Sequence, residues 1–196
     1  MMRKKSERWV LYSKVIQDTA DEMRKNPKLK EQAGSLEGDA GEIMTEKLFS
    51  KLNFDYEKIP QKVLKKIPKR LSELGGKRPD YIISIGDSFA NSSVVVADAK
   101  FYSTNGQSEF VIEEDEYNKY CGLIQYIKEQ YEVQDVTLLF FVWPKEAHFQ
   151  TYYIFDLDAL SKLPATATRD GKPAKKLLFS DPTVLKFDID WDEELA

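Results

Sequence analysis

Apolar residues recur at helical spacing in three stretches of the chain. They do so over residues 7–25, 37–52 and 113–131, where one apolar face repeats every three to four positions. Asn26-Pro27 ends the first pattern, and Ser35 is an N-cap candidate for the second. We therefore predict three helices, each with one buried face.

Strand-like runs lie between these helices and after the last of them. The run 93–102 is rich in valine and carries charge only toward its end, as is typical of a buried strand. Turn-like residues separate it from the β-branched run 79–85, so the two are predicted to form an antiparallel hairpin. Further strand-like runs are 54–60, 136–143 and 150–157.

The order of these elements indicates the fold class. A long helix between two strands requires a crossover, whereas the hairpin before it is antiparallel, so the sheet must be mixed. After residue 158 we expect a short helix, a turn and a terminal strand. The prediction is one α/β domain over 1–196, a mixed β-sheet flanked by helices. Its core is expected at about 37–143, with the helix at 7–25 and residues 158–196 as additions.

Length and composition agree with one soluble globular domain. The chain has 196 residues, of which 42% are hydrophobic and 32% charged, with a net charge of −4. No apolar run approaches the roughly 20 residues that span a bilayer, and the start of the chain lacks the apolar stretch of a secretory signal. We expect a cytoplasmic protein without a membrane partner. Taken alone, the net charge disfavours a nucleic-acid partner.

Residue counts exclude several chemistries. Cys121 is the only cysteine and His148 the only histidine, which excludes an internal disulfide, a cysteine zinc cluster and a multi-histidine metal site. Glycine-rich phosphate loops and the GxSxG nucleophile elbow are absent as well. Any chemistry must therefore rest on carboxylates, lysines and hydroxyls.

Asp98 and Lys100 interrupt the apolar run VVVADAKF, where a charged residue is unusual without a partner or a task. Strand alternation puts both on the face shared by Val94 and Val96, at the end where the strand leaves the sheet. One interpretation is a simple ion pair at the sheet margin. The other is a functional site.

Asp80 favours the functional interpretation. It opens the strand before the hairpin turn, and hairpin geometry brings it next to Asp98. Two carboxylates that close repel each other unless a cation lies between them, and oxygen ligands suit Mg²⁺ or Mn²⁺. The backbone carbonyl of Ala99 offers a further oxygen.

Pro79-Asp80, followed after 17 residues by Asp98-Ala99-Lys100, resembles the signature of the PD-(D/E)XK nuclease superfamily. The resemblance covers about residues 37–143, where the predicted order matches the αβββαβ core of the restriction-endonuclease-like fold. It implies Mg²⁺-dependent hydrolysis of phosphodiester bonds in DNA. Asp80, Asp98 and the Ala99 carbonyl would bind the metal, with Mn²⁺ as a substitute, and Lys100 would orient the attacking water.

The family often adds an acidic residue from the helix before the strands. At about 100° per residue, Glu42 borders the predicted buried stripe of that helix, whereas Glu46 is turned outward. We therefore select Glu42 as the additional catalytic and metal-binding residue; a solvated helix face is the alternative. The predicted stripe consists of Gly41, Met44, Leu48 and Leu52, with Phe49 at its edge.

A basic strip at 58–78 changes the interpretation of the net charge. It holds eight lysines and arginines against one glutamate and leads into Pro79-Asp80, so it could approach a phosphate backbone. A solvated surface is the alternative. Lys119 and Tyr120 resemble the Lys-Tyr pair that follows the catalytic strand in restriction-type members, although core packing explains Tyr120 equally well. The candidate nucleic-acid-binding residues are Lys65, Lys66, Lys69, Arg70, Lys77, Arg78, Asn105, Gln107 and Lys119.

The resemblance thus implies a DNA endonuclease, of the restriction or phage-defence kind. Because cutting both strands needs two active sites, a homodimer or a partner subunit is expected. A non-catalytic nucleic-acid-binding or assembly module on the same fold is the alternative. A third interpretation makes the ionic residues purely structural.

Overall fold

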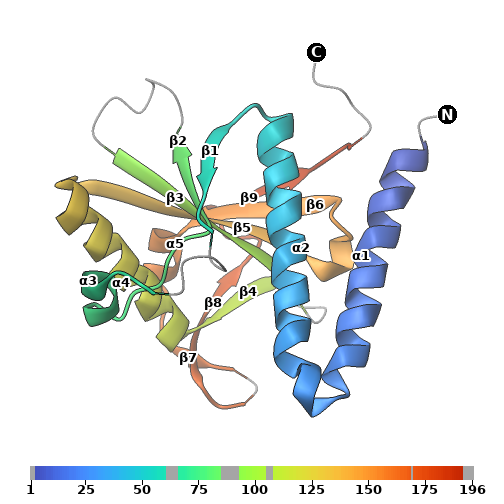
Figure 1. Ribbon diagram of the computed structural model, residues 1–196, viewed down its shortest axis with the longest axis horizontal. Helices are drawn as coiled ribbons and strands as arrows, with labels where there is room; N and C mark the ends of the chain where they lie inside the picture. The colour runs from blue at the N-terminus through green and yellow to red at the C-terminus, as the bar shows by residue number, and fades with distance from the viewer. Residues whose placement is uncertain (1–2, 61–65, 85–92, 105–107, 169, 192–196) are drawn as a thin grey trace.

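The protein is an α/β structure in which helices cover both faces of a mixed sheet (Figure 1). The computed structural model describes residues 3–60, 66–84, 93–104, 108–168 and 170–191.

Helices α1 (Arg3–Arg24) and α2 (Lys30–Lys51) form an antiparallel pair along one side of the sheet (Figure 1). The 3-10 turn Pro27–Leu29 joins them, capped by the Asn26 side chain, which accepts a hydrogen bond from the Lys28 N–H. The prediction that Ser35 caps the second helix is wrong, because the chain continues from this turn directly into α2. No helix in the described part of the chain is long and apolar enough to cross a membrane.

Within the described residues, the main sheet has six strands in the order β1-β2-β3-β5-β6-β9. Strands β3 and β5 are parallel, and the other neighbours are antiparallel, which confirms the predicted mixed sheet and the hairpin of β2 and β3. The bounds are β1 (Asp55–Lys58), β2 (Tyr81–Ser84), β3 (Ser93–Tyr102), β5 (Asp135–Pro144), β6 (Thr151–Asp156) and β9 (Leu185–Asp188).

Alternation along β3 divides the core into two layers. Val95, Ala97, Ala99 and Phe101 pack toward α2. Val96 packs on the opposite face, toward α4 (Glu114–Tyr131). This division confirms the predicted faces of the strand and places the Asp98 side chain under α4.

The apolar stripe of α2 differs from the prediction at one position. Gly41, Met44, Leu48 and Phe49 are buried as expected. Leu52 is 38% exposed, because α2 ends at Lys51 and the chain turns away before Leu52 can reach the sheet.

A second sheet was not predicted. It has the order β4-β8-β7 and packs against α4 and α5 (Leu157–Ser161). Strand β4 (Glu109–Glu113) runs directly into α4, so its pattern merges with that of the helix, and two lysines interrupt β8 (Pro173–Leu178). The remaining short elements of the described residues are β7 (Thr166–Ala167), α3 (Lys69–Glu73) and the 3-10 helix Lys145–Ala147.

Candidate functional site

Asp80 and Asp98 are opposite each other where the β2–β3 hairpin ends. Tyr81 is the register partner of Ala97, and the Asp80 N–H donates to the Ala97 carbonyl at 3.1 Å. The Ala99 N–H then donates to Asp80 Oδ2 at 2.9 Å. The Asp80 carboxylate thus takes the place of a backbone carbonyl of β2 as the acceptor for this N–H. Since the N–H and C=O of a strand residue point to the same side, the Ala99 carbonyl faces the same edge as Asp80.

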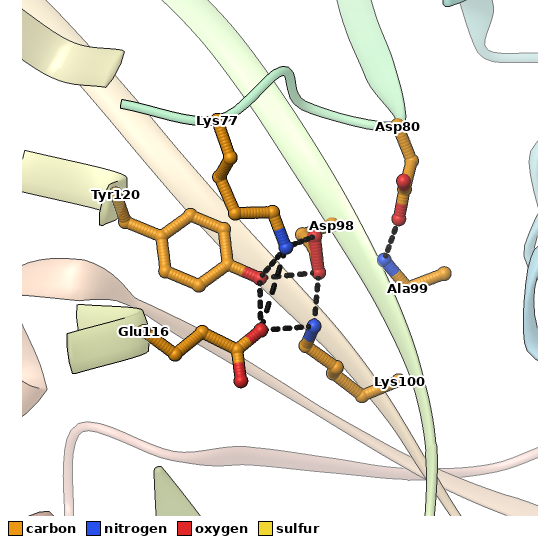
Figure 2. Close-up of polar contacts among 7 residues, drawn as sticks. All are labelled: Lys77, Asp80, Asp98, Ala99, Lys100, Glu116 and Tyr120. Atoms are coloured by element: carbon orange, nitrogen blue, oxygen red, sulfur yellow. Dashed lines mark hydrogen bonds and ion pairs between the residues drawn. The ribbon is translucent and has the colours of Figure 1, made fainter. Parts of the chain in front are cut away.

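The Asp98 carboxylate points toward α4 and lies in a cluster with two lysines, a tyrosine and a glutamate (Figure 2). Its Oδ1 atom accepts hydrogen bonds from Tyr120 at 2.6 Å and pairs with Lys100 Nζ at 2.8 Å. Its Oδ2 atom is 3.4 Å from Lys77 Nζ. Glu116 Oε1 is 3.0 Å from the Lys100 ammonium and 3.4 Å from that of Lys77. Asp98 and Lys100 thus share one face of β3 and one network, as the alternation predicts.

The two aspartates have opposite pKa shifts. Burial raises the pKa of Asp80 to about 7, and the charge of Asp98 adds to this shift. Burial alone would also raise the pKa of Asp98, but the charges of Lys100 and Lys77 lower it below its ordinary value. Asp98 is therefore a carboxylate at neutral pH, while Asp80 is held near its titration midpoint.

The partners of Asp98 respond to the same charges. Burial would lower the pKa of Lys100, but the carboxylates of Asp98 and Glu116 raise it. Burial would raise the pKa of Glu116, but Lys100 and Lys77 lower it. These shifts favour the ammonium form of Lys100 and the carboxylate forms of Asp98 and Glu116.

Lys77 is positioned by a contact between two glycines. A Cβ on Gly76 would lie 3.0 Å from the backbone of Gly122 and 2.3 Å from the Leu71 side chain. Because neither glycine has a side chain, the segment before Lys77 rests directly on α4, and the Lys77 N–H donates to the Lys119 carbonyl at 3.4 Å. The Lys77 ammonium then lies over the Tyr120 ring, 4.4 Å from its centroid.

Glu42 lies on α2, which packs on the sheet face opposite to Asp98. Its carboxylate pairs with Lys58 at 2.9 Å, and its backbone carbonyl accepts a hydrogen bond from the Tyr81 hydroxyl at 3.0 Å. The Glu42 charge contributes to the raised pKa of Asp80. Glu42 is thus close enough to Asp80 to act on it electrostatically, but it belongs to a different ion pair.

The end of the hairpin is also where the sequence predicts a metal ion. Among the described residues, no group of three or more His, Cys, Asp or Glu side chains is arranged to hold one. The carboxylates of Asp80 and Asp98 and the Ala99 carbonyl are the oxygen atoms predicted to do so, and all three belong to the end of the hairpin.

The basic residues expected to bind nucleic acid are dispersed. Lys66, Lys69 and Lys119 are exposed. Arg70 is exposed as well but forms ion pairs with Glu129 and Glu73. Arg78 is half-buried, and Lys77 points into the cluster around Asp98 (Figure 2). Lys65, Asn105 and Gln107 lie outside the described residues.

Sequence reasoning missed the roles of Lys77, Glu116 and Tyr120 in this network. The sequence places Lys77 in the basic strip, does not single out Glu116, and allows two interpretations of Tyr120. The usable signal was the spacing of Glu116 and Tyr120, which at i and i+4 share one helix face. The contact with Lys77 depends on tertiary packing and had no local signal.

A second buried carboxylate lies on α2, the helix that packs on the sheet face opposite to Asp98. Glu37 on α2 is 7% exposed and pairs with Arg24 at the end of α1 and with Lys145, which follows β5. Gln17 of α1 donates to the Lys145 carbonyl at 3.0 Å. This cluster ties α1 to the rest of the domain.

No protein-family model, no curated protein and no solved structure matches this chain. Any function must therefore be argued from the residues and the order of the elements.

Proposed function

We propose that the protein is a Mg²⁺-dependent endonuclease that hydrolyses phosphodiester bonds in DNA. The observation that carries the proposal is the placement of Asp80 opposite Asp98 across the β2–β3 pair, with Lys100 beside Asp98 on the same strand face. A carboxylate pair with an adjacent ammonium is what metal-assisted hydrolysis of a phosphate ester requires.

The order of the elements supports a restriction-endonuclease-like fold. Helix α2 is followed by the antiparallel strands β1, β2 and β3, then by α4 and by β5, which is parallel to β3. This is the αβββαβ order with two insertions, the short helix α3 between β1 and β2 and the strand β4, which belongs to the separate sheet. The Pro79-Asp80 and Asp98-Ala99-Lys100 motifs fall at the end of the hairpin, as they do in the family that the sequence resembles.

The oxygen atoms at this end fit a hard divalent cation. Asp80, Asp98 and the Ala99 carbonyl would hold it, with water completing the coordination, which suits the preference of Mg²⁺ for one or two carboxylates. Burial and the charge of Asp98 raise the pKa of Asp80 to about 7, so a cation would relieve a repulsion that is already present. Glu42 would add negative potential from the α2 side. Mn²⁺ is expected to substitute.

When bound, the cation would neutralise charge on the scissile phosphate and make an attacking water more acidic. In addition to the cation, Lys100 supplies a positive charge from a side chain of the protein. Its ammonium is 2.8 Å from Asp98 Oδ1, so it can hold a water next to Asp98 and offset the negative charge of the transition state. The exposed lysines at 66, 69 and 119 would contact the DNA backbone. A homodimer would supply the second active site for double-strand cleavage.

The test is cleavage of supercoiled plasmid with Mg²⁺ and with EDTA. We expect nicked or linear product from the wild type only when Mg²⁺ is present. Asp98→Asn and Lys100→Gln should each lower the rate by about 100-fold or more, since each removes a group that acts on developing charge. A matched control is Lys172→Met, which removes an exposed lysine paired with Glu113 on the second sheet.

Cleavage by Asp98→Asn at the wild-type rate would exclude this site. DNA binding by the wild type without cleavage, on substrates of varied sequence and with either Mg²⁺ or Mn²⁺, would favour the non-catalytic binding module. Loss of cleavage in the Lys172→Met control would mean that lysine removal acts through general electrostatics.

A further inference from the structure

Lys77 forms a second ammonium contact with Asp98, and the proposed mechanism does not use it. Its Nζ atom is 3.4 Å from Asp98 Oδ2, 3.4 Å from Glu116 Oε1 and 2.9 Å from the Tyr120 hydroxyl. We propose that Lys77 competes with the divalent cation for Asp98, so that the site binds metal tightly only together with a phosphate anion. This inference rests on the proposed function and concerns the regulation of the same site.

The two oxygens of Asp98 are unequally engaged. Oδ1 is held by Tyr120 at 2.6 Å and by Lys100 at 2.8 Å, both short, charge-assisted contacts. Oδ2 has its contact with Lys77 at 3.4 Å, which is beyond the usual range of a strong hydrogen bond. Oδ2 is thus the oxygen available to a metal, and the ammonium of Lys77 stands beside it.

The charges of the cluster around Asp98, without that of Asp80, are balanced before any metal enters. Lys77 and Lys100 carry two positive charges, and Asp98 and Glu116 carry two negative ones. A divalent cation at Oδ2 would therefore meet the repulsion of both lysines at close range and low dielectric. A phosphodiester that enters with the cation brings a negative charge and reduces this repulsion.

Moving the Lys77 ammonium into solvent would break contacts that hold it next to Asp98. Its backbone is fixed on α4 by the contact of Gly76 with Gly122, and its ammonium lies over the Tyr120 ring, 4.4 Å from the centroid. Its side chain is 29% exposed. The nearest alternative partner is Glu116, which it already approaches, so metal binding would shift the ammonium from Asp98 toward Glu116 or toward the bound phosphate.

The test measures Mn²⁺ affinity of the intact protein from the electron paramagnetic resonance signal of free Mn²⁺. Asp98→Asn provides the baseline for binding elsewhere. Lys77→Met should bind Mn²⁺ about tenfold more tightly than the wild type, because one nearby positive charge is removed. Lys77→Arg, which keeps the charge, should bind like the wild type. Glu116→Gln should bind more weakly, by about threefold or more, because it removes a negative charge from the same cluster.

A short DNA duplex with phosphorothioate linkages keeps the backbone charge and resists hydrolysis. Adding it should tighten Mn²⁺ binding to the wild type by about fivefold or more, and to Lys77→Met by less than about twofold. Lys172→Met is the matched control and should leave Mn²⁺ affinity unchanged.

The failures of the two proposals are distinguishable. If no variant binds Mn²⁺ above the Asp98→Asn baseline, the metal site fails and the proposed function with it. If the wild type binds Mn²⁺ but Lys77→Met binds it equally or more weakly, the role of Lys77 alone is overturned. Should Lys77→Met not fold, unchanged or tighter binding by Glu116→Gln would overturn the charge argument independently.

Discussion

Glu37 and Asp98 are the buried carboxylates in the described part of the chain, and the ionic clusters around them are built differently. Glu37 lies between Arg24 and Lys145, so its neighbours attract it. Asp98 also contacts two lysines, but the charges of Asp80 and Glu116 act on the same site and oppose its own. One cluster joins opposite charges, whereas the other also forces like charges together.

We interpret that difference as one between a structural role for Glu37 and the proposed functional role of Asp98. A carboxylate surrounded by cations stabilises the attachment of α1 without further requirement. A group of carboxylates held close together costs stability and is maintained in proteins mainly where the site has a task. The predictions below test whether stability and activity divide between the two clusters in this way.

The largest effect on stability is expected for Glu37→Gln. The substitution leaves the mostly buried Lys145 without its counter-charge and Arg24 with Asp21 alone, and we expect the free energy of unfolding to fall by about 3 kcal/mol. Urea denaturation measures this loss, while cleavage per folded molecule should stay unchanged. Glu22→Gln removes one partner of an exposed surface pair and should change stability by less than about 0.5 kcal/mol. Equal losses in the free energy of unfolding of the two variants would show that the burial of Glu37 does not increase its contribution to stability.

Asp80→Asn should have the opposite sign, because Asp80 is destabilised as a carboxylate. Its pKa is about 7 in the folded protein against 3.8 ordinarily, so the folded state holds a proton that the unfolded state has lost between these values. The contribution of Asp80 to stability is therefore full below about pH 4 and lost as pH rises through 7. In EDTA at pH 8 the variant should be more stable than the wild type by about 2 kcal/mol, and at pH 4 equally stable.

The measurement is urea denaturation across this pH range, with the exposed aspartate variant Asp55→Asn as the control. Asp55→Asn should follow the wild type at every pH. A difference between Asp80→Asn and the wild type that does not grow with pH would contradict the repulsion at the site.

The main sheet could be predicted from the sequence because its signals are local. The valine run gave strand β3 at 93–102, and the turn-like residues before it gave the hairpin, so Asp80 and Asp98 could be placed together. The second sheet had no comparable signal. Strand β8 buries Lys175, whose ammonium donates to the Leu163 carbonyl, and a lysine in a short run argues against a strand.

The residues of the candidate site also differ in whether a local sequence signal predicts them. Asp80, Asp98 and Lys100 follow from strand alternation and one hairpin, both of which the sequence encodes over a few residues. Lys77 and Glu116 join them only through the packing of α4 on the sheet, and that packing depends on contacts distant in sequence. For Glu42, helix periodicity correctly predicted a position bordering the core, but periodicity contains no information on its partner, Lys58.

The glycine contact that positions Lys77 predicts a change of intermediate size in the free energy of unfolding. A Cβ at Gly122 would lie 2.5 Å from the Leu74 carbonyl, so Gly122→Ala must push the segment before Lys77 away from α4. We expect a loss of about 1–2 kcal/mol in the free energy of unfolding. In the helical position Gly34, nothing lies within 4 Å of an added Cβ. Gly34→Ala should therefore stabilise the protein by about 0.5–1 kcal/mol, since alanine favours the helix. Two substitutions of one kind would thus have opposite signs, and equal signs would contradict the glycine contact.

The smallest effect is expected for Tyr120→Phe, which removes one oxygen from the Asp98 cluster. The hydroxyl donates to Asp98 Oδ1 at 2.6 Å and accepts from Lys77 at 2.9 Å, while the ring packs edge-on against Phe140. The ring contact remains in the variant, so only the hydrogen bonds are lost, at a cost of about 1 kcal/mol in the free energy of unfolding. Tyr131→Phe changes an exposed tyrosine on the same helix and should have no measurable effect in urea denaturation. If Tyr120→Phe is as stable as the wild type, the hydroxyl does not hold Asp98, and the two lysines alone must keep that carboxylate charged within the sheet.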